Sequence, residues 1–105
     1  MASSIDYLNY ILEQLNDLDG LSYKKMMGEY LLYIDGTLTG GIYDDRLLVK
    51  IANNNKKYNM QEAIPYTSAK PMYLVDEVDN KEVLKNILME MISQKIYIDL
   101  VKSYL

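Results

Sequence analysis

Cysteine, histidine, tryptophan and phenylalanine are all missing from this sequence of 105 residues. Without cysteine, the chain has no disulfide framework and no thiolate metal site. Without histidine, it lacks the usual general base and zinc ligand, and it lacks a Ser–His or Cys–His nucleophile pair. We therefore expect a protein that is not an enzyme and that uses no cofactor.

Positive charge and long apolar runs are also scarce. The 11 basic residues are outnumbered by 15 acidic ones, which gives a net charge of −4. An acidic chain is not generally attracted to nucleic acid or to anionic membrane, so direct binding to either is not expected. Nowhere do about 18 apolar residues run together, as a membrane span requires. The N-terminal residues lack the basic region of a signal peptide, and the predicted location is the cytoplasm.

The length and the composition predict one domain over residues 1–105, since half of the residues are hydrophobic. Ser3 or Ser4 can cap a first helix, and Asp6 follows Ser3 in an approximate capping box. Asp79 with Glu82 is a second capping signature. Apolar residues at three- and four-residue steps follow both caps: Leu8, Ile11, Leu12, Leu15 and Leu18, then Val83, Leu84, Ile87, Leu88, Met91 and Ile92.

Between these helices the apolar pattern is that of β-strands. We expect an antiparallel meander of four strands over residues 21–27, 29–34, 37–43 and 46–51, with a fifth strand over 71–75. Asp35-Gly36 is a tight-turn signal, and Gly40-Gly41 indicates a bulge or a close backbone approach. The predicted fold is α+β: a two-layer sandwich with both helices on one face of the sheet. Residues 52–61 are equally consistent with a helix and a loop, and residues 93–105 with a continued helix and a new one.

Alternation along the fourth strand sorts its side chains between the two faces of the sheet. Leu47, Val49 and Ile51 point toward the helices, whereas Arg46, Leu48 and Lys50 point outward. The second strand is apolar on both faces, which indicates a central strand whose outer side is partly covered. The outer face is therefore either an ordinary half-polar surface or an interface with a partner protein or a second copy.

The lysines allow a further reading of the same surface. If the first and fourth strands lie within reach, Lys25, Arg46 and Lys50 can converge on an anion or an acidic partner, and Lys70 can join them. The simpler interpretation is that these lysines are solvated and lie over apolar neighbours. The acidic groups Asp44-Asp45 and Asp76-Glu77-Asp79 are explained by a turn and a cap, so no metal site is expected.

The stretch KKMMGEYLLY at residues 24–33 is best explained by structure. Met26 and Met27 are expected to fill core space, Gly28 to permit a bend, and Glu29 to pair with a lysine across the ladder. No Gly-rich phosphate motif is present, because the residues GTLTGG are followed by no helix and no GK[ST].

Several of these segments together resemble the N-terminal domain of the TfoX/Sxy family, bacterial regulators associated with natural competence. The basic–Met–apolar–Gly start corresponds to residues 25–28, the strand ending in lysine to Leu47–Lys50, and a GKP-like element to Ala69-Lys70-Pro71. The resemblance covers roughly residues 4–92, and Ala69 replaces the usual glycine. It implies an α+β fold and a non-enzymatic regulatory role, such as assisting a transcription activator. Family regulators carry a second, C-terminal helical domain, for which this chain has no room.

Two functions follow as hypotheses from these observations. The first is a regulatory or adaptor protein that acts through protein–protein contacts, with a protein partner or a homodimer, on the outer sheet face or the exposed edge. The second is a small domain that binds an anionic ligand. The candidate contact residues for either are Lys25, Arg46, Leu48, Lys50 and Lys70.

Overall fold

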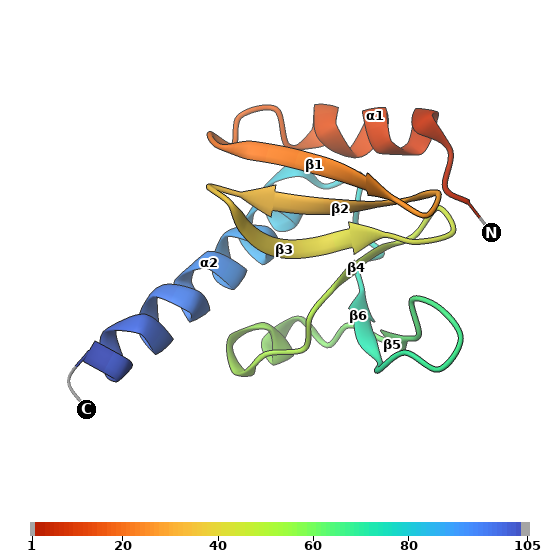
Figure 1. The fold of residues 1–105 in the computed structure, drawn as a ribbon. Coiled ribbons are helices and arrows are strands. Elements are labelled where there is room, and N and C mark those ends of the chain that lie inside the picture. Colours follow the sequence, from red (N-terminus) through yellow and green to blue (C-terminus); the bar gives the residue numbers. More distant parts are fainter. Residues whose placement is uncertain (1, 104–105) are drawn as a thin grey trace.

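The computed structural model describes the backbone of residues 2–103 and the side chains of residues 2–92. Its elements follow the predicted order and form an α+β fold (Figure 1). Helix α1 spans Ile5–Gln14, and strands β1, β2, β3 and β4 span Leu21–Met26, Glu29–Ile34, Thr37–Ile42 and Leu47–Val49. A 3-10 helix η1 (Asn53–Tyr58), strands β5 (Glu62–Ala63) and β6 (Met72–Leu74), and helix α2 (Lys81–Ser103) complete the chain.

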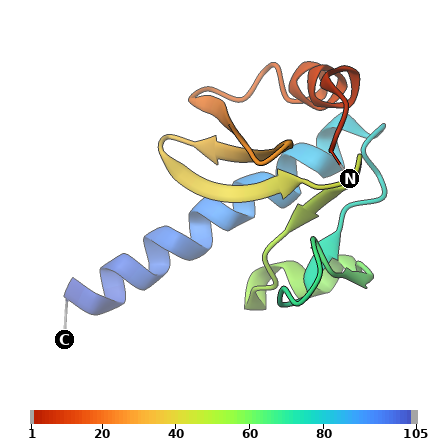
Figure 2. The ribbon, with the colours of Figure 1, turned by 45° about the vertical axis from the view of Figure 1, so that its right-hand side comes forward.

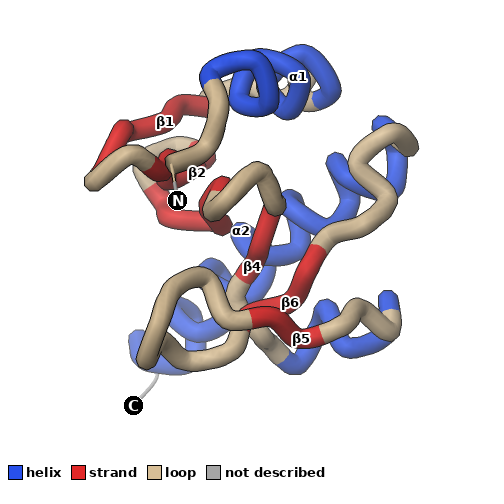
Figure 3. Tube along the Cα trace, turned by 90° about the vertical axis from the view of Figure 1, so that its right-hand side faces the viewer, coloured by secondary structure: helices blue, strands red, loops and turns tan. Residues whose placement is uncertain are grey.

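The six strands form one antiparallel sheet in the order β1-β2-β3-β4-β6-β5. Figure 3 looks along the sheet from one side and shows the strands following one another from β1 to β5. The meander and the strand at residues 72–74 are confirmed, whereas β5 is an additional strand of two residues. A strand so short carries too little alternation to be recognised in a sequence.

Tight turns connect the first four strands. Met27-Gly28 and Asp35-Gly36 each have positive φ at both residues, as two-residue type I′ hairpin loops require. Asp44 and Asp45 also have positive φ, at 53° and 55°. The bulge lies at Thr39, because β2 pairs Leu32 with Gly40 and the next residue, Tyr33, with Leu38. The two-glycine signal therefore marked the right region, and the extra residue is the threonine in front of it.

Both helices pack on the same face of the sheet and share one core with it. That core joins Leu8, Ile11 and Leu15 to Leu32, Leu47 and Val49, and then to Leu84 and Leu88 of α2. All of these side chains have no exposed surface, and burying each one contributes on the order of 2 kcal/mol. The C-terminal part of α2 extends away from the sheet (Figures 1 and 2). Within the described residues, no helix is long and apolar enough to cross a membrane.

The caps differ in detail from those expected. Ser4 is the N-cap of α1, and its hydroxyl accepts a hydrogen bond from the Tyr7 N–H at 3.1 Å. At α2 the side chain of Asn80, not that of Asp79, accepts from the Val83 N–H at 3.2 Å. Asp79 instead accepts a hydrogen bond from the Tyr10 hydroxyl on α1. Its place beside α1 is a tertiary contact, which a local capping pattern does not contain.

The polar segment after β4 resolves as the 3-10 helix η1, which lies against α2. The Asn54 amide donates to the Glu90 carbonyl at 2.7 Å, and the Tyr58 hydroxyl donates to the Glu90 carboxylate at 3.0 Å. Lys57 forms an ion pair with the same carboxylate at 2.7 Å. Beyond this contact α2 continues as one helix to Ser103, without a break at Ser93-Gln94. The first open segment therefore contains a short helix, and the described part of the second continues α2.

Three predictions about residues 24–33 are wrong. Met26 is half exposed and Met27 is 96% exposed, so neither fills the core. Glu29 pairs with no lysine among the residues with described side chains: its carboxylate accepts from the Ser3 N–H and hydroxyl at 2.8 and 2.7 Å and from the Asp44 N–H at 2.9 Å. The bend at Gly28 is confirmed by its φ of 84°. Glu29 thus ties the N-terminal segment and the β3–β4 turn to the start of β2.

Candidate functional site

The register of the sheet decides which lysine lies on which face. Tyr30, Leu32 and Ile34 of β2 are buried in the core, so Leu31 and Tyr33 lie on the outer face, opposite the helices. Cross-strand partners share a face, and β1 pairs Lys24 with Leu31 but Lys25 with Tyr30. Lys24 therefore belongs to the outer face, whereas Lys25 lies on the helix side of the sheet.

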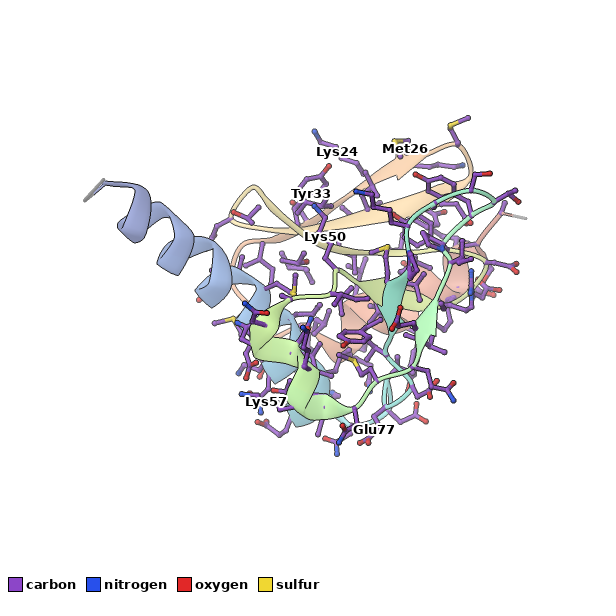
Figure 4. The ribbon with its side chains drawn as sticks, turned by 90° about the horizontal axis from the view of Figure 1, so that it is seen from below. Lys24, Met26, Tyr33, Lys50, Lys57 and Glu77 are labelled. Carbon is purple, nitrogen blue, oxygen red and sulfur yellow. The ribbon has the colours of Figure 1, made fainter. Side chains whose placement is uncertain are left out.

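We use the term outer face for the side chains of Lys24, Met26, Leu31, Tyr33, Leu38 and Lys50. Figure 4 labels four of these residues, and Lys24, Tyr33 and Lys50 follow one another in this view. The Lys24 ammonium lies 5.4 Å from the centre of the Tyr33 ring, as in a cation–π contact. Tyr33 in turn pairs with Leu38 of β3. The face is therefore an apolar strip with a lysine at each side.

A cleft continues this strip toward β6. It has a volume of about 470 Å³, and its walls come from β3, from the chain after β4, and from the loop between β5 and β6. Its main lining residues are Leu38, Lys50, Ile51, Pro65, Tyr66 and Lys70. The side chains of Lys50 and Lys70 have no ion pair or hydrogen bond within the described part of the chain. Their ammonium groups are thus available to an anion.

The Arg46 guanidinium is engaged in hydrogen bonds within the protein. Its Nε donates to the Tyr43 carbonyl at 3.1 Å, and its Nη2 donates to the Ile64 carbonyl at 3.1 Å. The guanidinium therefore joins the β3–β4 turn to the start of the β5–β6 loop. The Tyr43 side chain is buried beside Tyr66, with ring centres 6.3 Å apart, and burial raises the pKa of the Tyr43 hydroxyl. This corner of the sheet is a fixed wall of the cleft.

Leu48 points to the outer side of β4, as predicted, but it is fully buried. It lies between Gly41 of β3 and Leu74 of β6, and the Tyr43 ring packs against Gly41 next to it. The expectation that Leu48 is exposed to a partner is wrong. A strand pattern shows which face a side chain takes, but it does not show whether other parts of the protein cover that face.

Of the five candidate residues, the structure brings two together. Lys50 and Lys70 line the same cleft, whereas Lys25 is on the opposite face, Arg46 is bound to carbonyls and Leu48 is buried. Sequence reasoning missed Lys24 and Tyr66. The signal for Lys24 was present, because counting in twos from the half-buried Leu21 places Tyr23 and Lys25 inward and Lys24 outward. Nothing in the sequence indicated that the loop around Tyr66 lies beside Tyr43.

The groups on this surface suit binding. Lysine ammonium groups attract anions, and the tyrosine and leucine side chains offer apolar area next to them. The acidic pairs of the sequence have structural contacts elsewhere: Asp45 accepts from the Ser4 N–H at 2.8 Å, and Asp79 accepts from Tyr10. Among the residues with described side chains, no three acidic groups come together as metal ligands.

Comparison with known proteins extends this description. The family model of the TfoX N-terminal domain matches residues 13–87, which include the whole sheet and the start of α2. A protein of Spirochaeta aurantia, described as an uncharacterized 12.7 kDa protein in the trpE 5′ region, is 29% identical over 80 residues. The matched part is 74% of this chain and 70% of that protein.

Proposed function

Because the chain belongs to the TfoX N-terminal domain family, whose members are non-enzymatic regulators associated with competence, we propose that it is a regulatory adaptor. In this proposal the outer face binds an acidic surface of a partner protein, such as a transcription activator. The observation that carries the proposal is the segregation of charge. A chain with a net charge of −4 places Lys24, Lys50 and Lys70 on one side of its sheet, next to exposed apolar side chains.

Charge of one sign on a surface favours a partner of the opposite sign. Complementary charges steer encounter and specify the partner, while the apolar strip supplies area to be buried. A twofold face-to-face dimer would instead bring the lysines of one copy near those of the other. We therefore favour a different protein as the partner over a homodimer through this face.

The neighbouring residues Lys24 and Lys25 provide a matched test. They carry the same charge, both are exposed, and they lie on opposite faces of one strand. Immobilised wild type, Lys24→Glu and Lys25→Glu are compared for proteins captured from a lysate of the source organism, at low and at high salt. We expect a salt-sensitive partner that Lys24→Glu captures at least about tenfold less well and that Lys25→Glu captures as wild type does.

Equal capture by all three proteins would refute the outer face as the contact surface. An equal loss in both variants would also refute it, since it would indicate pairing at the edge of β1 or a general charge effect. Capture of nucleic acid that Lys24→Glu abolishes would replace the protein partner with another polyanion. Equal circular dichroism spectra and melting temperatures of the three proteins would show that the substitutions change the surface and leave the fold intact.

A further inference from the structure

We propose that the cleft beside Lys50 and Lys70 is a binding site for a small amphipathic anion, a molecule with an apolar body and one carboxylate or phosphate group. The site differs from the protein contact proposed above, since it is a concave cavity and the contact is an extended strip. The two share Lys50 and Lys70, so an occupied cleft would change the charge that the outer face presents. Ligand binding would thereby regulate the contact.

The size and lining of the cleft match those of small-molecule sites. Its volume of about 470 Å³ lies within the range of roughly 300–1,000 Å³ that such sites occupy. Most of its lining is apolar, with Leu38 and Ile51 on one side and Pro65, Tyr66 and Met72 on the other. Ile51 and Tyr66 are 38% and 64% exposed, so an apolar body placed between them would remove this surface from water.

The charges of the cleft specify an anion. Among the described residues that line it, Lys50 and Lys70 are the only charged ones. Neither side chain has an ion pair or hydrogen bond within the described part of the protein, and no carboxylate of that lining neutralises them. The two lysines approach from different segments, one directly after β4 and one just before β6. An anionic group between them would be held from two sides.

Close contacts at two glycines of β3 and a hydrogen bond from Arg46 position the walls of the cleft. A Cβ on Gly41 would lie 2.6 Å from the Tyr43 ring, so the absence of a side chain lets this ring pack against the backbone of β3. A Cβ on Gly40, another lining residue, would lie 2.5 Å from the Leu48 carbonyl oxygen. The Arg46 guanidinium then holds the Ile64 carbonyl, at the start of the loop that carries Pro65 and Tyr66. The cavity is thus bordered by a fixed strand and a tethered loop.

Amide chemical shifts of the purified, isotope-labelled protein test the site. The probes are phenylbutyrate, phenyl phosphate and the neutral phenylbutanol, titrated into millimolar concentration. We expect saturable shifts at Gly40, Ile51, Ala69 and Lys70 with at least one of the anions. Phenylbutanol is expected to bind about tenfold more weakly, because it loses the charged hydrogen bonds to lysine. Whichever of the two anions binds more tightly indicates whether the site prefers a carboxylate or a phosphate.

Three variants make the result specific. Lys50→Met and Lys70→Met are each expected to weaken anion binding about tenfold while phenylbutanol binds as before. Lys25→Met, which removes the same charge on the opposite face, is the control and should bind as wild type does. Ala69→Leu fills the cleft and should abolish binding of all three probes.

The proposal is overturned if neither anion produces a saturable shift, if the alcohol binds as tightly as the anions, or if Lys25→Met weakens binding as much as Lys50→Met. Shifts confined to residues outside the cleft would also overturn it. The experiment uses the isolated protein, so its failure leaves the proposed partner contact standing. Failure of the capture experiment likewise leaves the ligand site standing.

Discussion

Lys24 and Lys25 show how one position along a strand decides what a side chain can do. They differ by a single residue in the sequence, yet one faces Leu31 on the outer face and the other faces Tyr30 on the helix side. A shift of one residue in a strand exchanges its two faces. The predicted convergence of Lys25 with Lys50 failed for this reason, although the kind of surface that was predicted is present.

Met27 is a second residue whose position the composition did not reveal. Apolar side chains normally enter the core, but Met27 occupies the first position of a hairpin loop with φ of 54° and is 96% exposed. A left-handed conformation costs a methionine roughly 1–2 kcal/mol, which asparagine largely avoids. The turn geometry, set by the pairing of β1 with β2, therefore outweighs the preference of the side chain.

The substitution Met27→Asn should stabilise the protein, because Asn-Gly is the preferred pair for a type I′ loop. We expect the free energy of unfolding to rise by about 0.5–1 kcal/mol, measured by urea denaturation. Met26→Asn, a matched change in the adjacent strand, should give no such gain, since strands disfavour asparagine. An unchanged or lower stability of the Met27 variant would show that this methionine makes favourable contacts despite its exposure.

Among the elements, β3 was predicted to be a strand with a bulge or a close backbone approach at Gly40-Gly41. The bulge that it has is accompanied by a side-chain hydrogen bond. The extra residue Thr39 is fully buried, and its hydroxyl donates to the Leu32 carbonyl at 3.2 Å. That carbonyl lies where the ladder between β2 and β3 changes register. The threonine hydroxyl thus gives this carbonyl a buried hydrogen bond at the point where the regular ladder is interrupted.

Thr39→Val keeps the shape of the side chain and removes this donor. We expect a loss of about 0.5–1.5 kcal/mol in the free energy of unfolding, because one buried hydrogen bond to the Leu32 carbonyl is removed. Thermal or urea denaturation measures the loss, and Thr39→Ser, which keeps the hydroxyl, should recover part of it. If valine were as stable as threonine, the hydrogen bond would contribute nothing to the bulge.

The helices were the most accurately predicted elements, and the reason is that their signals are local. Ser4 and the apolar residues of α1 lie within a few turns of one another; the stripe is confirmed, and Ser4 is the one of the two candidate caps that the structure uses. The helix nevertheless ends at Gln14, and Leu15 and Leu18 reach the core from the turn that follows. A continuous apolar stripe therefore did not mean a continuous helix, because an apolar side chain can pack against the sheet from a helix or from a turn.

Over the molecule as a whole, the absence of histidine governs how stability depends on pH. Apart from the terminal amino group, no ordinary side chain of this composition titrates between about pH 6 and 9. At higher pH the tyrosine side chains determine how stability depends on pH. Burial raises the pKa of Tyr7, with Asp45 and Asp79 adding to the effect, and burial likewise raises the pKa of Tyr43 above the ordinary 10.0.

A phenol whose folded-state pKa is raised favours the folded state while it is neutral. This contribution is fully present below the unfolded pKa of about 10 and is lost as the pH rises through the folded value. We therefore expect the urea midpoint to be nearly constant from about pH 6 to 9 and to fall above pH 10. The fall should be less steep in Tyr7→Phe. A midpoint that changes by half between pH 6 and 8 would contradict this.

The sequence by itself determined the class of this protein, the order of its helices and strands, and the exclusion of the usual nucleophilic and thiolate chemistry. These conclusions rest on composition and on periods of two and of three to four residues, which are local properties of the chain. They also sufficed for the family, because its motif residues lie within the strands and turns that the pattern defines.

Only the tertiary structure decided which side chains reach a partner. The hydrogen bond from Arg46 to the Ile64 carbonyl and the cleft between Lys50 and Lys70 depend on the β5–β6 loop lying beside the outer face, and Leu48 is buried between β3 and β6. That hydrogen bond joins residues that are 18 positions apart, Arg46 and Ile64. A contact between distant segments leaves no periodic signal along the chain, because it is selected by the packing of the whole sheet and not by neighbouring residues.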